Sequence, residues 1–164
     1  MCDLETPAIR QARRNLGRFL QASIEKRRRD LGFGWQLTNE APRTYAELRH
    51  AFQASQLHRH PLPVRPLATG DGGFLFWHDT THAMLNHDFT PEGETAVARH
   101  QLLQLQMAGY PPTSMEHRVL TADSLSHIHC GIQIGRYPRD SATFSTRAVL
   151  QGTDQAIALE AQRP

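Results

Sequence analysis

The sequence predicts an all-α protein, a single-domain helical bundle that spans residues 1–164. Apolar residues recur every three or four positions along most segments, and helix-starting signals precede several of these segments. The alternating or β-branched runs that are typical of strands are scarce. A chain of 164 residues is long enough to bury the core of one domain.

The first predicted helix covers about residues 7–31, because Thr6 and Pro7 form a helix start and an apolar stripe continues until Gly32. A second helix begins at the capping box 44–47 and runs to about residue 57. Residues 58–73 contain three prolines and three glycines, so we expect a loop or an extended connector there.

Helical spacing resumes over residues 74–86, and Thr90 with Pro91 opens a further helix that ends near Gly109. These two helices form the central hairpin of the predicted bundle, about residues 74–109. Shorter helices are predicted at 114–119 and 124–134, with one more near 143–152, so that C-terminal helices fill about residues 114–150. We expect the last ten or so residues to be frayed.

Composition excludes several classes of protein. No run of eighteen apolar residues is present, and the first residues lack the apolar segment of a secretory signal, so we predict a soluble, cytoplasmic protein without a transmembrane segment. Cys2 and Cys130 are too few and too far apart for a disulfide framework or a cysteine-rich zinc finger. The oligomeric state is not predicted by any feature of the sequence.

Positive charge is concentrated at the N-terminus. Residues 1–31 hold eight basic and four acidic side chains, a net charge of +4, whereas the whole chain carries +2. The favoured interpretation is a solvated helix face, with Arg27, Arg28 and Arg29 placed where a helix C-terminus attracts cations. A basic helical module that binds nucleic acid, or another interaction partner, is the alternative.

The stretch "FWHDTTHAMLNHDFTPEGE", residues 76–94, places metal-ligand side chains among apolar residues. On a helix, Asp79 lies about 100° from His78 and His82 about 40° from it, so the three side chains share one arc. Residues 86–91 break the helix, so a tight turn can bring Glu94 back beside the two histidines. His78, Asp79, His82 and Glu94 are therefore predicted to bind a divalent metal, most readily Zn²⁺, with Mn²⁺ or Fe²⁺ as alternatives.

Simpler explanations exist for the individual residues. A glutamate at position 94 is favoured by the dipole of the helix that begins at Pro91, and a buried histidine is commonly only hydrogen-bonded. Four ionisable groups on an apolar stripe are nevertheless costly to bury unless they are paired or bound to a cation. The predicted ligand set is free of cysteine and rich in carboxylates, which favours a catalytic metal over a structural one.

The spacing of these residues resembles a known family. His78, Asp79 and His82, followed after eleven residues by Glu94, match the H-D-x-x-H-x11-E metal signature of the ubiquinone-biosynthesis family (Coq-four) over about residues 75–110. The resemblance implies a mostly helical fold, zinc bound at these four positions and a role in modifying the head group of coenzyme Q at C1, an activity that would make the protein an enzyme acting on a small molecule.

A second enzyme class fits the same dyad. His78 and Asp79 also resemble the central pair of HD-type metal phosphohydrolases, which are all-α and add an upstream histidine and a downstream aspartate. Asp123 could supply the aspartate, and three upstream histidines are available, at His50, His58 and His60. This interpretation leaves Glu94 without a role.

The remaining histidines and acids are weaker candidates. His127 and His129 alternate along the chain, so they cannot share one helical face, and either could act as a general base or orient a metal ligand. His87, Glu92 and His100 project away from the predicted ligands and are assigned to turn, capping and core positions.

Overall fold

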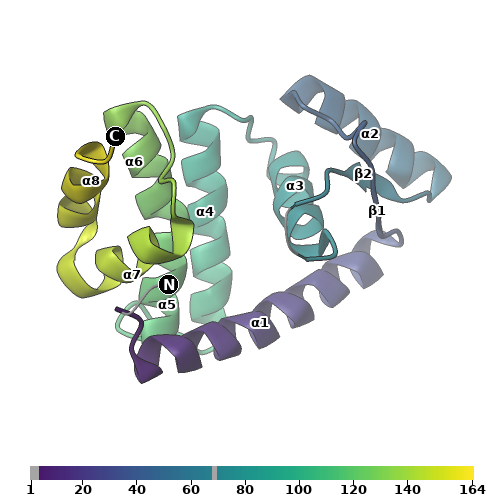
Figure 1. Ribbon diagram of the computed structural model, residues 1–164. Coiled ribbons are helices and arrows are strands. Elements are labelled where there is room, and N and C mark those ends of the chain that lie inside the picture. The colour runs from purple at the N-terminus through teal and green to yellow at the C-terminus, as the bar shows by residue number, and fades with distance from the viewer. Residues whose placement is uncertain (1–3, 68–69) are drawn as a thin grey trace. The chain divides into compact units, whose positions relative to one another are not determined.

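Helices make up most of the described chain, residues 4–67 and 70–164 of this computed structural model, which confirms the predicted all-α class. Cys2 and residues 68–69 of the predicted connector lie outside the described residues. The elements run in the order α1 (Pro7–Leu31), β1 (Trp35–Leu37), α2 (Tyr45–His58), β2 (Leu62–Val64), α3 (Gly73–Leu85), α4 (Pro91–Met107), α5 (Met115–Thr121), a π-helical turn (Ala122–Ser126), α6 (His127–Ile134), α7 (Ser141–Gln151) and α8 (Thr153–Ala161) (Figure 1).

The chain divides into two compact units. The central unit is Arg18–Val97, and the terminal unit joins the described residues up to Gly17 with Ala98–Pro164. Helices α1 and α4 each contribute residues to both units. A single domain over residues 1–164 stays a prediction. None of the helices in the described chain combines the length and the apolar character needed to span a membrane.

The core of the central unit is aromatic. Phe33 packs edge-on against Phe52 and Phe76, with ring centroids 5.9 and 6.2 Å apart. The buried residues of this core come from β2, α2, α3 and the segment after α1: Phe33, Leu48, Phe52, Leu62, Val64, Leu75 and Phe76. Offset and edge-to-face ring pairs are stabilising beyond the area that they bury. Helix α3, which carries the predicted ligands His78, Asp79 and His82, is thus held on its apolar side by this core.

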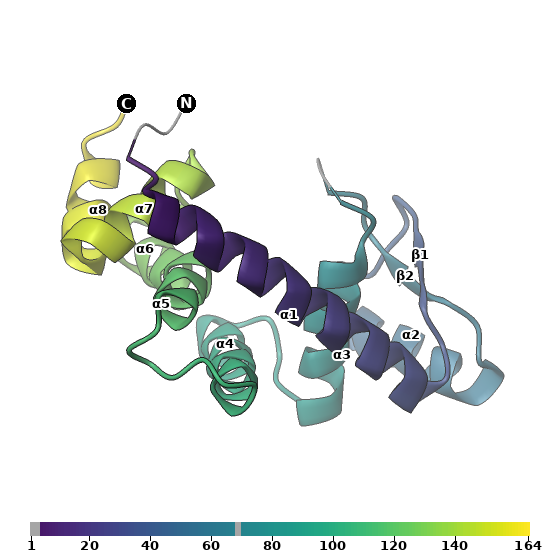
Figure 2. The same cartoon turned by 90° about the horizontal axis from the view of Figure 1, so that it is seen from below.

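The two short strands of the central unit were not predicted. β1 and β2 pair in parallel, with Trp35 opposite Leu62 and Leu37 opposite Val64, and they lie side by side in both views (Figures 1 and 2). Three-residue strands are too short to show an alternating pattern, and Pro63 within β2 argues against a strand from sequence alone. Part of the segment 58–73, which was expected to be a loop or an extended connector, is therefore a strand. This strand, β2, ends directly before Arg65.

One arginine of the basic cluster is not on a solvated face. Arg27 is buried, and its guanidinium donates hydrogen bonds to Thr80 Oγ1 at 2.7 Å, Thr81 Oγ1 at 3.1 Å and the Trp77 carbonyl at 3.2 Å. Burial lowers the pKa of Arg27, although the nearby charge of Asp30 opposes this effect. The prediction that residues 27–29 form a solvated end of the helix is thus wrong for Arg27, while Arg28 and Arg29 are exposed.

The terminal unit contains two differences from the predicted elements. Helix α5, the π-helical turn and α6 follow one another without a break from Met115 to Ile134, where the sequence predicted two separate helices. Predicted fraying of the last residues is also wrong, because α8 covers Thr153–Ala161 and buries Ala156, Ile157 and Glu160. Helix α8 packs on α7, and its apolar contacts are what order these residues.

Candidate metal centre

Helix α3 carries two of the predicted ligands on successive turns. His78 is half-buried and His82 fully buried, and their Nε2 atoms lie 3.2 Å apart. The helix begins after Gly72, which has a φ of 87° and a position where an added Cβ would press against Leu37 and Val64. It ends at Asn86, whose left-handed conformation (φ 56°) lets the chain turn away from the helix axis.

The turn after α3 sends the chain back toward the histidines. Asp88 Oδ1 accepts hydrogen bonds from the backbone N–H of Thr90 at 3.1 Å and from its hydroxyl, and Thr90 Oγ1 in turn accepts one from the N–H of Gly93 at 3.2 Å. Gly93 is required here because a Cβ would overlap the carbonyl oxygen of Asp88. These contacts fix the first turn of α4, which contains Glu94.

Glu94 reaches both histidines from this first turn. Its Oε2 lies 3.2 Å from Nε2 of His78 and 3.1 Å from Nε2 of His82. One ligand atom from each of the three residues therefore falls within 4.8 Å of the others. The predicted folding back of Glu94 beside the two histidines is confirmed, and the three residues form a group that could hold a metal ion.

Asp79 is not a member of this group. It is half-buried and lines the same cavity as His78 and Glu94. Burial raises the pKa of the Asp79 carboxyl, and the charges of His78, His82 and Arg65 oppose the rise. A role of Asp79 as a ligand stays a prediction.

His82 is oriented as a metal-binding imidazole would be. Its Nδ1 donates a hydrogen bond to the carbonyl oxygen of His87 at 2.9 Å, so that Nε2 faces Glu94. Such an outer partner fixes the orientation of metal-bound histidines. The ring of Phe89 packs edge-on against His82 at 5.0 Å, and Phe74 stacks on His78 at 5.8 Å. Nδ1 of His78 is buried without a hydrogen-bond partner among the described residues.

The group is electrostatically coupled. Burial alone would raise the pKa of Glu94, but hydrogen bonds from His78 and His82 outweigh it and lower the pKa to about 2. Burial likewise disfavours the charged form of His82, yet the hydrogen bonds to Glu94 and to the His87 carbonyl raise its pKa overall. Glu94 is therefore a carboxylate that attracts positive charge, and a divalent cation can take the place of the proton shared with the imidazoles.

A cavity of about 250 Å³ is lined by two of the three residues, His78 and Glu94, and all its lining residues belong to the central unit. Its walls include the rings of Phe74 and Phe89 and two exposed arginines, Arg43 and Arg65. Sequence reasoning missed both arginines. Arg43 directly precedes the capping box of α2, and Arg65 follows a strand that has no sequence signature, so no motif pointed to either.

The other residues proposed from the sequence are not members of the metal-competent group among the described residues. His127 and His129 belong to the terminal unit: His127 bonds to the Ala122 carbonyl at 2.6 Å and to the Ser141 hydroxyl at 2.9 Å, and His129 is exposed. Asp123 lies in the same unit and pairs with Arg13 at 3.0 Å. The three histidines weighed for a phosphohydrolase site are exposed and are not members of the metal-competent group: His50, His58 and His60.

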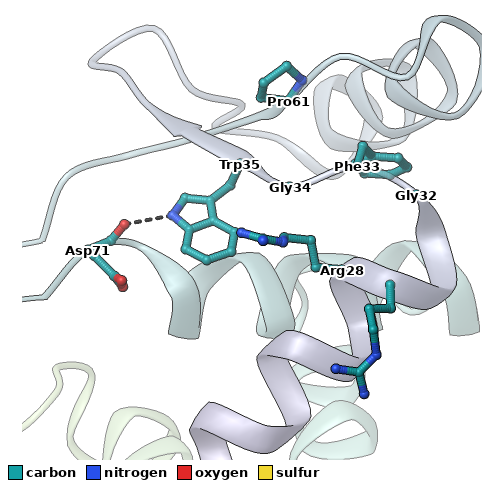
Figure 3. A pocket seen from close by; sticks show the side chains of 8 residues that line it. Arg28, Gly32, Phe33, Gly34, Trp35, Pro61 and Asp71 are labelled. Atoms are coloured by element: carbon teal, nitrogen blue, oxygen red, sulfur yellow. Dashed lines mark hydrogen bonds between the residues drawn. The ribbon is translucent and has the colours of Figure 1, made fainter.

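A second, wider cavity of about 660 Å³ lies where α1 ends and β1 begins (Figure 3). Its lining includes Trp35, whose indole N–H donates to the Asp71 carbonyl at 2.6 Å, and three charged residues, Arg28, Arg29 and Asp71. It has no group of histidines and carboxylates, so the smaller cavity is the better candidate for a site of chemistry.

None of the protein-family models, curated proteins or solved structures compared with the chain matches it. The functional conclusion therefore depends on the site. Two imidazole nitrogens and a carboxylate oxygen are suitable ligands for zinc and neighbouring divalent ions, and three protein ligands next to a cavity leave room for a water or a substrate oxygen.

Proposed function

We propose that the chain binds one divalent cation through His78, His82 and Glu94 and functions as a metal-dependent enzyme. A single observation carries this proposal: donor atoms from two helices converge within 4.8 Å at the wall of a cavity. Structural zinc sites are closed by four protein ligands, commonly cysteines, whereas catalytic sites keep one position for water or substrate.

Zinc is the proposed ion, because two histidines and one carboxylate are a frequent ligand set of catalytic zinc. Mn²⁺ and Fe²⁺ accept the same nitrogen and oxygen donors and are the alternatives. Asp79 lines the cavity beside the group, and we assign it either the fourth ligand position of the motif or a hydrogen bond to the water on the ion.

The chain's own residues would prepare the site for chemistry. The His87 carbonyl holds the His82 ring, and the rings of Phe74 and Phe89 pack against His78 and His82 and cover part of the imidazole surface. Partial exclusion of water strengthens electrostatic interactions within the site. The bound ion would supply Lewis-acid polarisation of a substrate oxygen or activation of water.

The resemblance to the ubiquinone-biosynthesis family (Coq-four) is supported by the helical fold and by the meeting of three motif positions. That resemblance implies a phenolic or quinone head group as substrate, whereas the two arginines that line the cavity, Arg43 and Arg65, favour an anion. The HD-type arrangement is less well supported, because it leaves out Glu94, which contacts both histidines, and because its aspartate, Asp123, already pairs with Arg13.

Metal analysis of the purified protein tests the proposal. We expect about one zinc per chain in the wild type and a clear loss of metal in His78→Ala and in Glu94→Ala. Glu92→Ala is the matched control, since Glu92 lies in the same helical turn, is exposed and is not part of the group. Equal metal content in all four proteins would contradict the proposal.

A further inference from the structure

Two arginines line the cavity beside the proposed metal centre. Arg43 and Arg65 line the cavity together with His78, Asp79 and Glu94. Both are exposed, and neither guanidinium donates a hydrogen bond to another residue in the described parts of the chain; Arg65 affects Asp79 only through its charge. Their donors are therefore available to a ligand, and a guanidinium is suited to bidentate contacts with oxyanions.

Hydrogen bonds of the backbone at or next to each position, and none from the arginine side chains in the described parts of the chain, place these two arginines. The N–H of Arg43 donates to Glu47 Oε2 at 2.9 Å, which fixes the segment before α2. Arg65 follows Val64, whose carbonyl accepts from the N–H of Thr38 at 2.9 Å at the end of the parallel strand pair. The backbone at positions 43 and 65 is thus fixed, while the hydrogen-bond donors of both guanidinium groups are available to a ligand.

The charge balance of the cavity indicates which anion fits. Asp79 and Glu94 contribute two negative charges, the arginines two positive charges, and the proposed divalent ion two more. With neutral histidines the metal-bearing site carries a net charge of +2, so a dianion would neutralise it. A neutral phenol or quinone would leave both guanidinium groups without a partner, and a monoanionic carboxylate would compensate only half of the charge.

The remaining walls limit the size of the ligand. Phe74 and Phe89 flank the imidazoles, and the volume of about 250 Å³ is below the range of about 300–1,000 Å³ that is common for ligand pockets. A small body with an apolar or planar part fits these walls, whereas a nucleotide would have to extend outside the cavity.

We propose that the substrate is a small phosphate monoester, whose phosphoryl oxygens are bound by Arg43 and Arg65 beside the metal ion. This inference rests on the metal site of the proposed function and names the substrate class for it. Arg43 and Arg65 are binding residues in this proposal, and neither is required for holding the ion.

Phenylphosphonate and benzoate are the probes that test it, because they share a ring and differ in the charge and shape of the anion. Isothermal titration of the zinc-loaded protein at pH 8 should show binding of phenylphosphonate and at least tenfold weaker binding of benzoate. Arg43→Gln and Arg65→Gln should each weaken phenylphosphonate binding about tenfold or more, as expected for the loss of a hydrogen bond to a charged group.

Arg49→Gln is the control, since Arg49 is exposed on α2 of the same unit and does not line the cavity. Zinc content is measured first for every variant. If the wild type holds no metal, the proposed function fails, and this inference fails with it. If all variants hold zinc but benzoate binds as well as phenylphosphonate, or Arg49→Gln is as damaging as the cavity variants, only the substrate assignment is overturned.

Discussion

His82 donates its Nδ1 proton to the backbone carbonyl of His87, five residues further along the chain, at a distance of 2.9 Å. The left-handed conformation of Asn86 turns this carbonyl back onto the ring, and the N–H of His87 itself donates to the carbonyl of His82 at 3.0 Å. The end of α3 thus sets the orientation of a proposed ligand without using a further side chain.

The first prediction follows from this end of the helix. Asn86→Val should lower metal affinity about tenfold or more, because a β-branched residue disfavours a positive φ and the His87 carbonyl would move away from His82. Asn86→Gly should keep the affinity within about threefold, since glycine adopts this conformation freely. Competition with a chelator measures both values.

A side-chain contact of Asn86 must be separated from its backbone role. The Tyr45 hydroxyl donates to Asn86 Oδ1 at 2.7 Å, and both substitutions at position 86 remove this bond. Tyr45→Phe removes this bond, together with the longer contact of the same hydroxyl with the His82 carbonyl at 3.5 Å, and serves as the control because it leaves the backbone at position 86 unchanged. Similar metal affinities for the valine and glycine variants would contradict the backbone explanation.

The second prediction concerns the turn into α4. Gly93→Ala should destabilise the protein by about 3 kcal/mol, the upper end of the range for overpacking, because the new Cβ would overlap the carbonyl oxygen of Asp88. The turn must shift to relieve the overlap, and Glu94 shifts with it. Metal content should therefore fall together with stability. Chemical denaturation and metal analysis measure the two effects.

Gly17→Ala is the matched control for this substitution. Gly17 lies within α1, and an added Cβ would meet no atom within 4 Å. Alanine should stabilise the helix there by about 0.5–1 kcal/mol and leave the metal content unchanged. A tolerated alanine at position 93 would show that the tight turn is not what places Glu94.

Local signals were sufficient to predict the meeting of the three ligands. The i, i+4 spacing of His78 and His82 defines one face of α3. Residues 86–91 indicate a break in the helix, so a tight turn could bring Glu94 back toward that face. Asp79 was predicted to share the arc of the two histidines, but at about 100° from His78 its side chain projects further round the helix than that of His82. It is not a member of the group that the structure brings together, and its role as a ligand stays a prediction.

Long-range contacts explain what sequence patterns did not reveal. Arg27 looked like part of a solvated basic end, yet its partners, Thr80 and Thr81, lie more than fifty residues away. Arg65 lines the cavity because it directly follows β2. This strand and its partner β1 have only three residues each, too few to show an alternating pattern. Neither contact leaves a periodic signal in the neighbouring sequence.

The third prediction is a pH dependence in the terminal unit. Glu160 is almost fully buried, with 3% of its side chain exposed, and bonds to Arg136 at 2.5 Å and to the N–H of Arg139 at 3.1 Å. Burial alone would raise the pKa of Glu160, but these hydrogen bonds and the charge of Arg163 lower it overall. A lowered pKa stabilises the fold above the ordinary pKa of a glutamate, and the contribution disappears as pH falls through the folded value.

Glu160→Gln should accordingly reduce the free energy of unfolding by about 1.5–3 kcal/mol at pH 7, the value of hydrogen bonds to a charged group. The difference from the wild type should shrink as the pH falls below about 4.3, where the wild-type carboxyl becomes protonated in the unfolded chain. Urea denaturation at several pH values measures this. Asp154→Asn, at an exposed position of the same helix, should show little change, and a gap that is independent of pH would refute the linkage.

The fourth prediction separates a catalytic ion from a structural one. The core of the central unit is built from apolar and aromatic residues, and the three proposed ligands lie outside it. Removal of the metal should therefore leave the helical circular dichroism signal unchanged. If the ion were required for folding, as in small zinc domains, the chain would instead be unfolded after the metal is removed.

Return of the metal should then stabilise the folded chain by mass action. Free Zn²⁺ at a hundred times its dissociation constant adds about 2.7 kcal/mol, which corresponds to a rise in Tm of roughly 5–10 °C for a chain of this size. His82→Gln removes one ligand and should abolish the zinc-dependent rise while the helical signal persists. The two imidazoles and Glu94 act as one site only if each of them contributes to the affinity for zinc. If zinc still raises the Tm of His82→Gln, it therefore binds elsewhere on the chain.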